Sequence, residues 1–301
     1  MSENLTIDKN LIYEDLSNQP IVHGVVTISH GMAEHIERYS WLINKLNQAG
    51  YHVISIDHLG HGRHIEKGDD QGFFSDLDGF ECVENNLINI LSYADNKFPD
   101  LKKILIGHSM GSWISLGIIQ KYFKLDDMVL TGSSLIPNSV LKSQKKLVSM
   151  LIMLFGKKSY SKLIDNITMR KYNLNFSPNR TPNDWLSRDK ISVDEYTNDP
   201  KCGFLVTNSL WYQLSDQMMK VFNHLNYSKV NNELPIYLIS GDRDPVGDNG
   251  NGVESLHKFL LDIFPKTYLN LVKDARHEVF NEINKDESFK DMLSFFDSHI
   301  K

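Results

Sequence analysis

The chain has 301 residues, of which 41% are apolar and 23% are charged, and its formal net charge is −6. This composition excludes disordered, collagen-like and low-complexity chains, and a chain of this length can bury a large core. The 38 acidic against 32 basic residues argue against a nucleic-acid partner, because binding phosphates requires a basic excess.

Cysteine content and apolar segments indicate the compartment. Cys82 and Cys202 are too few for a disulfide framework and form no C-x-x-C pair, which favours reduced thiols. Residues 1–10 are polar and do not resemble a signal peptide. The most apolar stretch, Leu147–Phe155, is shorter than the roughly 20 residues that span a bilayer. We therefore expect a cytoplasmic protein, at most peripheral to a membrane.

The first 131 residues alternate between apolar runs of strand length and segments of helical period. This alternation predicts a mostly parallel sheet with helices on both faces. Strands are expected at Val22–Ser29, His52–Asp57, Lys103–Ile106 and Met128–Thr131, and helices at Tyr39–Leu46, Phe80–Ala94 and Gly111–Tyr122.

From about Ser134 to Leu210 the alternation stops and gives way to helical pieces, basic clusters and polar loops. It then resumes, with helices expected at Trp211–Leu225, Val253–Phe264 and Val279–His299 and strands at Pro235–Ser240 and Thr267–Val272. We expect an α/β core formed by residues 1–133 and 211–301, interrupted by a cap at 134–210.

Residues Gly107–Gly111 (G-H-S-M-G) match the motif G-x-S-x-G, between a predicted strand and a predicted helix. So tight a turn strains the serine backbone, and side chains at the glycine positions would collide with neighbouring structure. The turn would raise the Ser109 hydroxyl above the carboxyl edge of the sheet. The motif predicts a nucleophilic serine; the alternative is an ordinary turn with a buried serine.

A serine nucleophile needs a base, and the base needs a carboxylate that holds it in the right tautomer. His277 follows one predicted strand, and Asp242 and Asp244 follow another, so all lie at carboxyl ends, where chemistry gathers in such sheets. The residues alone do not separate Asp242 from Asp244. Three further histidines are weaker candidates, because they lie in predicted helices or at the terminus: His224, His257 and His299.

An oxyanion hole requires two backbone N–H donors that converge on the substrate carbonyl. One is expected to be the amide of Met110, which follows the serine. The second is expected from the loop His30–His35, through the amide of Met32.

Several segments together resemble the α/β-hydrolases of the monoacylglycerol lipase and lysophospholipase branch, the serine aminopeptidase S33-like group. They are H-G-M-A-E-H-x-x-R-Y (30–39), D-H-x-G-H-G (57–62), G-H-S-M-G (107–111), N-D-P-K-C-G-F (198–204), G-D-R-D-P-V-G (241–247) and A-R-H-E-V-x-N-E (275–282). The likeness runs from about residue 20 to the C-terminus, with a divergent middle of the cap.

The resemblance implies an α/β-hydrolase fold with an inserted helical cap. It implies Ser109 as nucleophile, Asp244 as the acid in preference to Asp242, and His277 as base, with the Met32 and Met110 amides as oxyanion hole. His64 departs from relatives, which often carry a serine near that position, so a different loop shape is expected there.

Other segments can be considered as sites for a metal ion or a phosphate-containing cofactor. His58, His61 and His64 recur every third residue, but they lack the cysteine and carboxylate partners of a metal site. Residues 247–252 are rich in glycine and acidic residues but lack the spacing of a calcium loop. Glycine-rich phosphate motifs are missing too. No metal and no organic cofactor is expected.

The apolar stretch Leu147–Phe155 lies between Lys145-Lys146 and Lys157-Lys158, a pattern that suits a helix at a lipid interface. Such a helix could line an acyl tunnel or make transient contact with a membrane surface, or it could simply pack the cap onto the core. Met150 and Leu154 are the candidate substrate-binding residues.

The favoured prediction is a serine carboxylester hydrolase that acts through an acyl-enzyme on a small amphiphilic ester, a mono-acyl lipid such as a monoacylglycerol or lysophospholipid. A short-chain carboxylesterase and an aminopeptidase or amidase with the same triad are the alternatives within enzymes. A non-catalytic ligand-binding relative is the alternative from another class.

Overall fold

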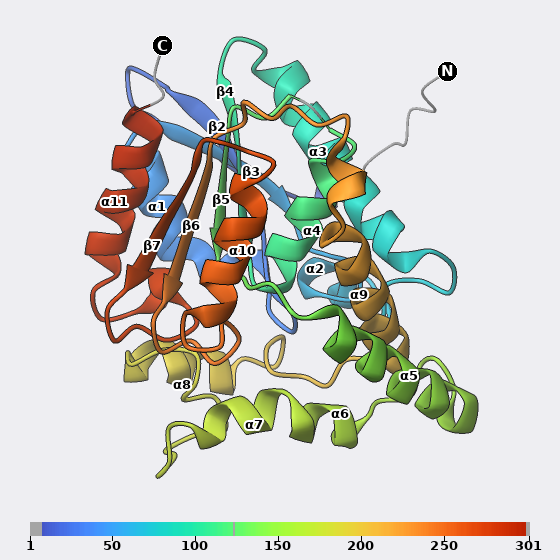
Figure 1. Cartoon of the computed structure of the whole chain (residues 1–301). Coiled ribbons are helices and arrows are strands. Elements are labelled where there is room, and N and C mark those ends of the chain that lie inside the picture. Colours follow the sequence, from blue (N-terminus) through green and yellow to red (C-terminus); the bar gives the residue numbers. More distant parts are fainter. Residues whose placement is uncertain (1–7, 123, 299–301) are drawn as a thin grey trace.

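The computed structural model describes residues 8–122 and 124–298, so the polar segment before residue 8 and His299 lie outside the described residues. Seven strands form one sheet in the order β1-β3-β2-β4-β5-β6-β7 (Figure 1). β1 pairs with β3 antiparallel, and the other neighbours pair parallel. The strands are β1 (Ile12–Asp15), β2 (Gly24–Ser29), β3 (Tyr51–Ile56), β4 (Lys102–His108), β5 (Asp127–Thr131), β6 (Ile236–Gly241) and β7 (Thr267–Val272).

Helices cover both faces and the carboxyl edge of this sheet. They are α1 (Ser40–Gln48), α2 (Gly62–Glu66), α3 (Gly79–Lys97), α4 (Met110–Ile118), α5 (Asn138–Phe155), α6 (Lys162–Ile167), α7 (Met169–Leu174), α8 (Lys190–Asn198), α9 (Asn208–Val221), α10 (Asn251–Leu261) and α11 (Lys285–Asp297). Short 3₁₀ turns are η1 (Lys9–Leu11), η2 (Ile36–Tyr39), η3 (His224–Tyr227) and η4 (Val279–Asn281).

The strand sequences are apolar on both faces because both faces are buried, as is usual for parallel sheets. In β4, Ile104 and Ile106 join the core beneath α1 and α11, whereas Leu105 joins the core beneath α3, α4 and α10. This alternation confirms the predicted doubly covered sheet and its strand positions. It also aligns the carboxyl ends of the parallel strands along one edge.

One strand and one helix differ most from the prediction. The edge strand β1 was not expected, because it is short and half exposed and carries only a weak apolar pattern. The predicted helix 279–299 is divided into η4 and α11. Between them Glu282 adopts an extended backbone, and its carboxylate accepts the N–H groups of Arg188 and Arg276. This anchoring interrupts the helix.

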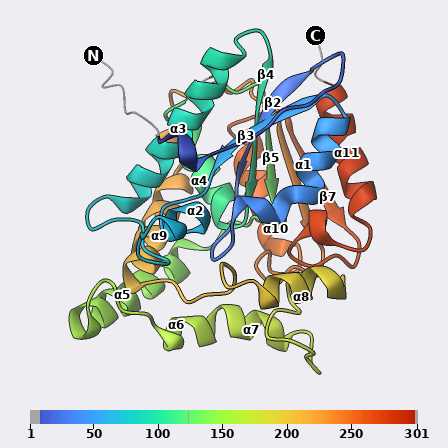
Figure 2. The same ribbon diagram turned by 180° about the vertical axis from the view of Figure 1, so that it is seen from behind.

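Helices α5 to α8 lie across the carboxyl edge of the sheet (Figures 1 and 2). α5 packs along α9, which in turn contacts α3 and α4. α9 begins at Asn208, three residues before the predicted start, because the Thr207 hydroxyl caps it by accepting the Leu210 N–H. Within residues 8–122 and 124–298, every helix is too short or too polar to cross a bilayer.

Candidate active site

Ser109 lies in the tight turn between β4 and α4, with a left-handed φ of 51°. A Cβ atom at Gly111 would lie 2.0 Å from the Ser29 carbonyl oxygen, and one at Gly107 would lie 2.5 Å from the Ser115 hydroxyl. Contacts this short exclude any side chain. The predicted strain and the predicted steric role of both glycines are confirmed.

The loops after β6 and β7 bring Asp244 and His277 together. His277 Nδ1 lies 2.9 Å from Asp244 Oδ2, and both side chains are buried. The second carboxylate oxygen of Asp244 accepts the Val246 N–H at 2.9 Å, which fixes its orientation. The alternative acid, Asp242, lies two residues earlier, where its own N–H bonds to the Val272 carbonyl. The contact with His277 therefore falls to Asp244.

The His277 ring is held by packing as well as by the carboxylate. Its centroid lies 4.7 Å from the His108 ring and 4.9 Å from the Trp185 ring. Burial alone would lower the pKa of His277, but the charge and hydrogen bond of Asp244 outweigh it and raise the pKa above the ordinary 6.5. Burial, reinforced by His277, lowers the pKa of His108 to about 4, so this neighbour is neutral at pH 7.

Ser109 and His277 face the same cavity, whose volume is about 290 Å³. The loop after β2, the Ser109 turn and the loop that carries His277 form the core side of the cavity. Segments between α5 and α9, together with Trp211 of α9, form the opposite side. Apolar and aromatic side chains form much of the wall: Met32, Met169, Trp185, Leu186, Tyr196, Phe204, Leu205, Val206 and Trp211. Charged side chains line the cavity as well, among them Lys162, Asp165 and Arg170. A buried imidazole–carboxylate pair beside a strained serine in such a cavity is the arrangement of a serine hydrolase.

The profile of one protein family, described as serine aminopeptidase S33, matches residues 20–284. The chain belongs to this family. It is a serine hydrolase with the α/β-hydrolase fold, as the sequence resemblance implied.

This S33 hydrolase is similar to characterised proteins along most of its length. The monoacylglycerol lipase of Mycolicibacterium smegmatis is 26% identical over 294 residues, covering 96% of this chain and 94% of the relative. The human monoglyceride lipase is 24% identical over 270 residues, covering 86% and 80%. The crystal structure of a thermostable carboxyl esterase from Bacillus coagulans, in complex with glycerol, has a TM-score of 0.88 at 27% identity and covers 96% of this chain and 94% of that one.

The predicted loop His30–His35, hereafter the His30 loop, lies beside the serine. A Cβ at Gly31 would lie 3.3 Å from Ser109 Cβ, and Met32 and Ala33 line the cavity. The Gly31 N–H donates to the Glu34 carboxylate at 2.5 Å. The structure thus brings Met32 and Met110, which follows Ser109 at the start of α4, to the same region.

A buried charge network beneath this loop was not predicted. Arg38 donates to Glu34 at 2.6 Å and forms a two-pronged pair with Glu278 at 2.7 and 2.8 Å, and Tyr39 donates to Glu34 at 2.8 Å. Burial opposes ionisation of Glu34, but Arg38 and nearby groups lower its pKa to about 2. All four residues of this network lie in the segments that carry the family resemblance, and that was the available signal. The sequence did not show which of them pair.

The three histidines considered as metal ligands have separate partners. His58 bonds to the Ser29 hydroxyl, His61 to the Leu59 carbonyl, and His64 to the Asp69 carboxylate. All three are buried, and burial lowers the pKa of His61 to about 3. This is the pattern of histidines that serve packing, each with its own hydrogen-bond partner.

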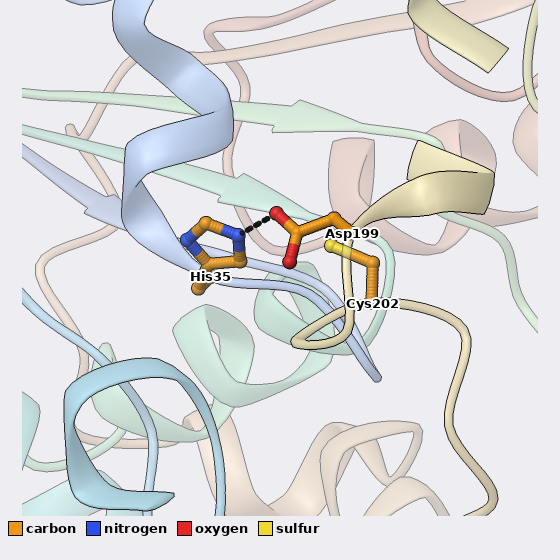
Figure 3. A group of neighbouring side chains, drawn as sticks. All are labelled: His35, Asp199 and Cys202. Carbon is orange, nitrogen blue, oxygen red and sulfur yellow. Dashed lines mark hydrogen bonds and ion pairs between the residues drawn. The ribbon is translucent and has the colours of Figure 1, made fainter. Parts of the chain in front are cut away.

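A different group, His35, Asp199 and Cys202, has donor atoms within 4.8 Å of one another (Figure 3). Nitrogen, carboxylate and thiol donors could in principle hold a borderline metal such as Zn²⁺. His35 Nε2, however, is already hydrogen-bonded to Asp199 at 2.8 Å. Burial raises the pKa of the Cys202 thiol, which disfavours the thiolate that a metal requires.

Met150 and Leu154, the candidate substrate-binding residues, are not brought to the serine cavity. They lie on α5 with 49% and 61% of their surface exposed. The opposite side of α5 packs inward through Leu141, Val148 and Leu151. The structure therefore places an apolar helix face at the surface rather than in the cavity wall.

Proposed function

We propose that Ser109, Asp244 and His277 are the catalytic triad of a carboxylester hydrolase that cleaves mono-acyl lipids. The single observation that carries the proposal is the 2.9 Å contact of buried Asp244 with His277, which lines the same cavity as Ser109. The contact occupies Nδ1, so Nε2 is free to serve the serine hydroxyl. The raised pKa of His277 suits a general base that becomes an imidazolium during the reaction.

In the proposed reaction His277 takes the Ser109 proton as the oxygen attacks the ester carbonyl. The amides of Met32 and Met110 donate to the resulting oxyanion; removing one such donor typically costs about 3 kcal/mol of barrier. His277 returns the proton to the departing alcohol. Water then attacks the acyl-enzyme by the same route, and the fatty acid leaves. Asp244 remains ionised throughout.

Cavity size and the relatives support a mono-acyl substrate. The volume of about 290 Å³ is at the lower end for ligand pockets and suits one acyl chain with a small alcohol rather than three chains. Similar proteins are named monoacylglycerol lipases. We propose residues 134–210 as the cap that forms the outer wall.

The two cysteines bear on the cellular location. Buried Cys202 and the absence of a disulfide partner for Cys82 support a reducing, cytoplasmic location.

We further propose that the cap meets lipid surfaces through the outer face of α5, α6 and α7. Large apolar side chains on this face are exposed, and lysines border it. An apolar face with basic edges matches the zwitterionic or anionic surface of a bilayer. Its most exposed members are Met153 (78%), Leu174 (67%), Phe155 (66%) and Leu154 (61%).

A fluorophosphonate probe tests the site and a substrate panel tests the class. The probe should label the wild type and leave Ser109→Ala unlabelled. Monoacylglycerols, lysophospholipids, triacylglycerols, short-chain esters and aminoacyl amides would then be compared by kcat/KM. We expect mono-acyl lipids to rank first. Preference for short-chain esters or amides would refute the substrate class, and labelling of the alanine variant would refute the nucleophile.

A further inference from the structure

The His30 loop is held from outside by the segment that ends the proposed cap. The Ala33 carbonyl accepts two hydrogen bonds from this segment, one from the Tyr196 hydroxyl at 3.1 Å and one from the Gly203 N–H at 2.9 Å. Tyr196 and Ala33 are both buried, so water competes little for these bonds. We call residues 196–203 the strap.

Two further contacts join the strap to the same part of the core. Asp199 accepts the hydrogen bond from His35 at 2.8 Å, as the dashed line in Figure 3 shows. The Arg38 guanidinium lies over the Tyr196 ring, 4.6 Å from its centroid. The strap therefore contacts the loop directly at Ala33 and His35. It is linked to the Gly31 end indirectly, because Arg38 also binds Glu34, whose carboxylate accepts the Gly31 N–H.

The loop needs such support because its backbone is strained. Ala33 has a φ of 55°, a conformation that residues with a Cβ rarely adopt and that persists only when the surroundings enforce it. Relaxation of Ala33 would rotate the peptide groups on either side of it. The Met32 N–H belongs to the next peptide group, between Gly31 and Met32, and would shift with them. An oxyanion donor tolerates little misplacement, since displacement of about 1 Å can cost on the order of 100-fold in rate.

We propose that the strap positions the oxyanion hole, with Tyr196 as the main positioning residue through its hydroxyl on the Ala33 carbonyl. The inference rests on the proposed role of the Met32 amide as an oxyanion donor. It means that the end of the cap contributes to catalysis at the ester carbonyl, in addition to enclosing the substrate.

Tyr196→Phe is the sharpest test, because it removes the hydroxyl and keeps the ring over Arg38. With p-nitrophenyl butyrate we expect kcat to fall about tenfold and KM to change less than twofold, a smaller loss than deletion of a donor would cause. Tyr160→Phe is the matched control. It also removes one hydroxyl hydrogen bond from the cap to a core carbonyl, that of Gln71, but neither Tyr160 nor Gln71 lines the cavity. Its kcat should match the wild type.

Two inhibitors separate positioning from general packing. A trifluoromethyl ketone forms a tetrahedral adduct with an oxyanion, whereas an ether analogue of the substrate only occupies the cavity. In Tyr196→Phe, affinity for the ketone should fall by the same factor as kcat, and affinity for the ether should remain within twofold. Equal losses for both inhibitors, or an unchanged kcat, would overturn the proposal.

A double-mutant cycle with Asp199→Asn adds an independent check. If both residues hold the same loop, the losses in kcat should be less than multiplicative in the double variant. Strictly multiplicative losses would contradict a shared action. The soluble ester serves all the kinetic measurements, so they remain decisive if mono-acyl lipids prove not to be the preferred substrates. Failure of the fluorophosphonate to label the wild type would be the separate sign that the proposed chemistry fails.

Discussion

The carboxyl edge of the sheet and the helices α5 to α7 that lie across it differ in how completely their apolar side chains are buried. At the edge, Ser109, Asp244 and His277 come from three loops whose strands are fixed by parallel pairing and by apolar cores on both faces. α5 to α7 instead leave large apolar side chains in contact with solvent. The edge is specified by steric necessity, whereas the outer helices expose apolar surface that the proposed contact with lipid would cover. Changes at the edge should therefore abolish function, and changes on the outer helices should only redirect it.

The largest effect is expected for Asp244→Asn. The amide would favour the wrong tautomer of His277, so kcat should fall by about 10⁴ on every ester, with KM little changed. Steady-state kinetics on a soluble and a lipid ester would measure this. A loss confined to the lipid ester would mean that the edge and the outer helices are not separable in the proposed way.

Arg38→Met should cost stability at the edge. It leaves the buried carboxylates of Glu34 and Glu278 without their cation, which typically destabilises a protein by about 3–5 kcal/mol. Urea unfolding would measure the loss. The control is Arg180→Met, which removes an exposed ion pair with Asp194 beyond α7 and should cost at most about 1 kcal/mol. Similar losses in the two variants would erase the contrast.

The pH dependence of kcat/KM should report His277. The base acts when neutral, and its pKa is raised above 6.5, so activity should be full at higher pH and decline as pH falls through that raised value. Below it the rate should drop about tenfold per pH unit. A pH series on p-nitrophenyl butyrate tests this, and Leu154→Glu should share the midpoint. A midpoint below 6.5 would contradict the effect of Asp244.

The smallest effect is expected for Leu154→Glu. A charge on the exposed face of α5 weakens contact with a bilayer, so hydrolysis of a long-chain monoacylglycerol in vesicles should fall a few-fold while a soluble ester is cleaved at the wild-type rate. Vesicle sedimentation should show the same decrease in binding. Equal rates on both substrates would mean that the apolar face has another use.

Much of the edge could be predicted because its residues obey local rules. Gly107 is required by contacts within its own turn and the helix after it, and Gly111 by the carbonyls of Ser29 and His30 at the end of the neighbouring strand. The strand positions follow from apolar runs that both faces bury. The choice between Asp242 and Asp244 was different. These two aspartates are two residues apart in one loop, and they differ only in which one the turn directs to His277. The residues alone left that choice open, whereas the family resemblance pointed to Asp244.

The remaining features depend on contacts between distant segments. Arg38 pairs with Glu278 across 240 positions, and Ala33 meets Tyr196 across 163, so no local pattern reports either. The orientation of α5 was also ambiguous. The apolar stretch with basic ends did not show which side faces inward: Leu151 is buried and Leu154 is 61% exposed although they lie within one turn, and packing against α9 decides between them.

The strap has a consequence for protein engineering. A chimaera that grafts another hydrolase's lid onto this scaffold would ordinarily be spliced at the ends of the insertion, after β5 and before α9. Such a splice would also replace the donors to Ala33. A graft that ends before Tyr196 would retain the host's own strap, and we expect it to change substrate selectivity while leaving kcat unchanged.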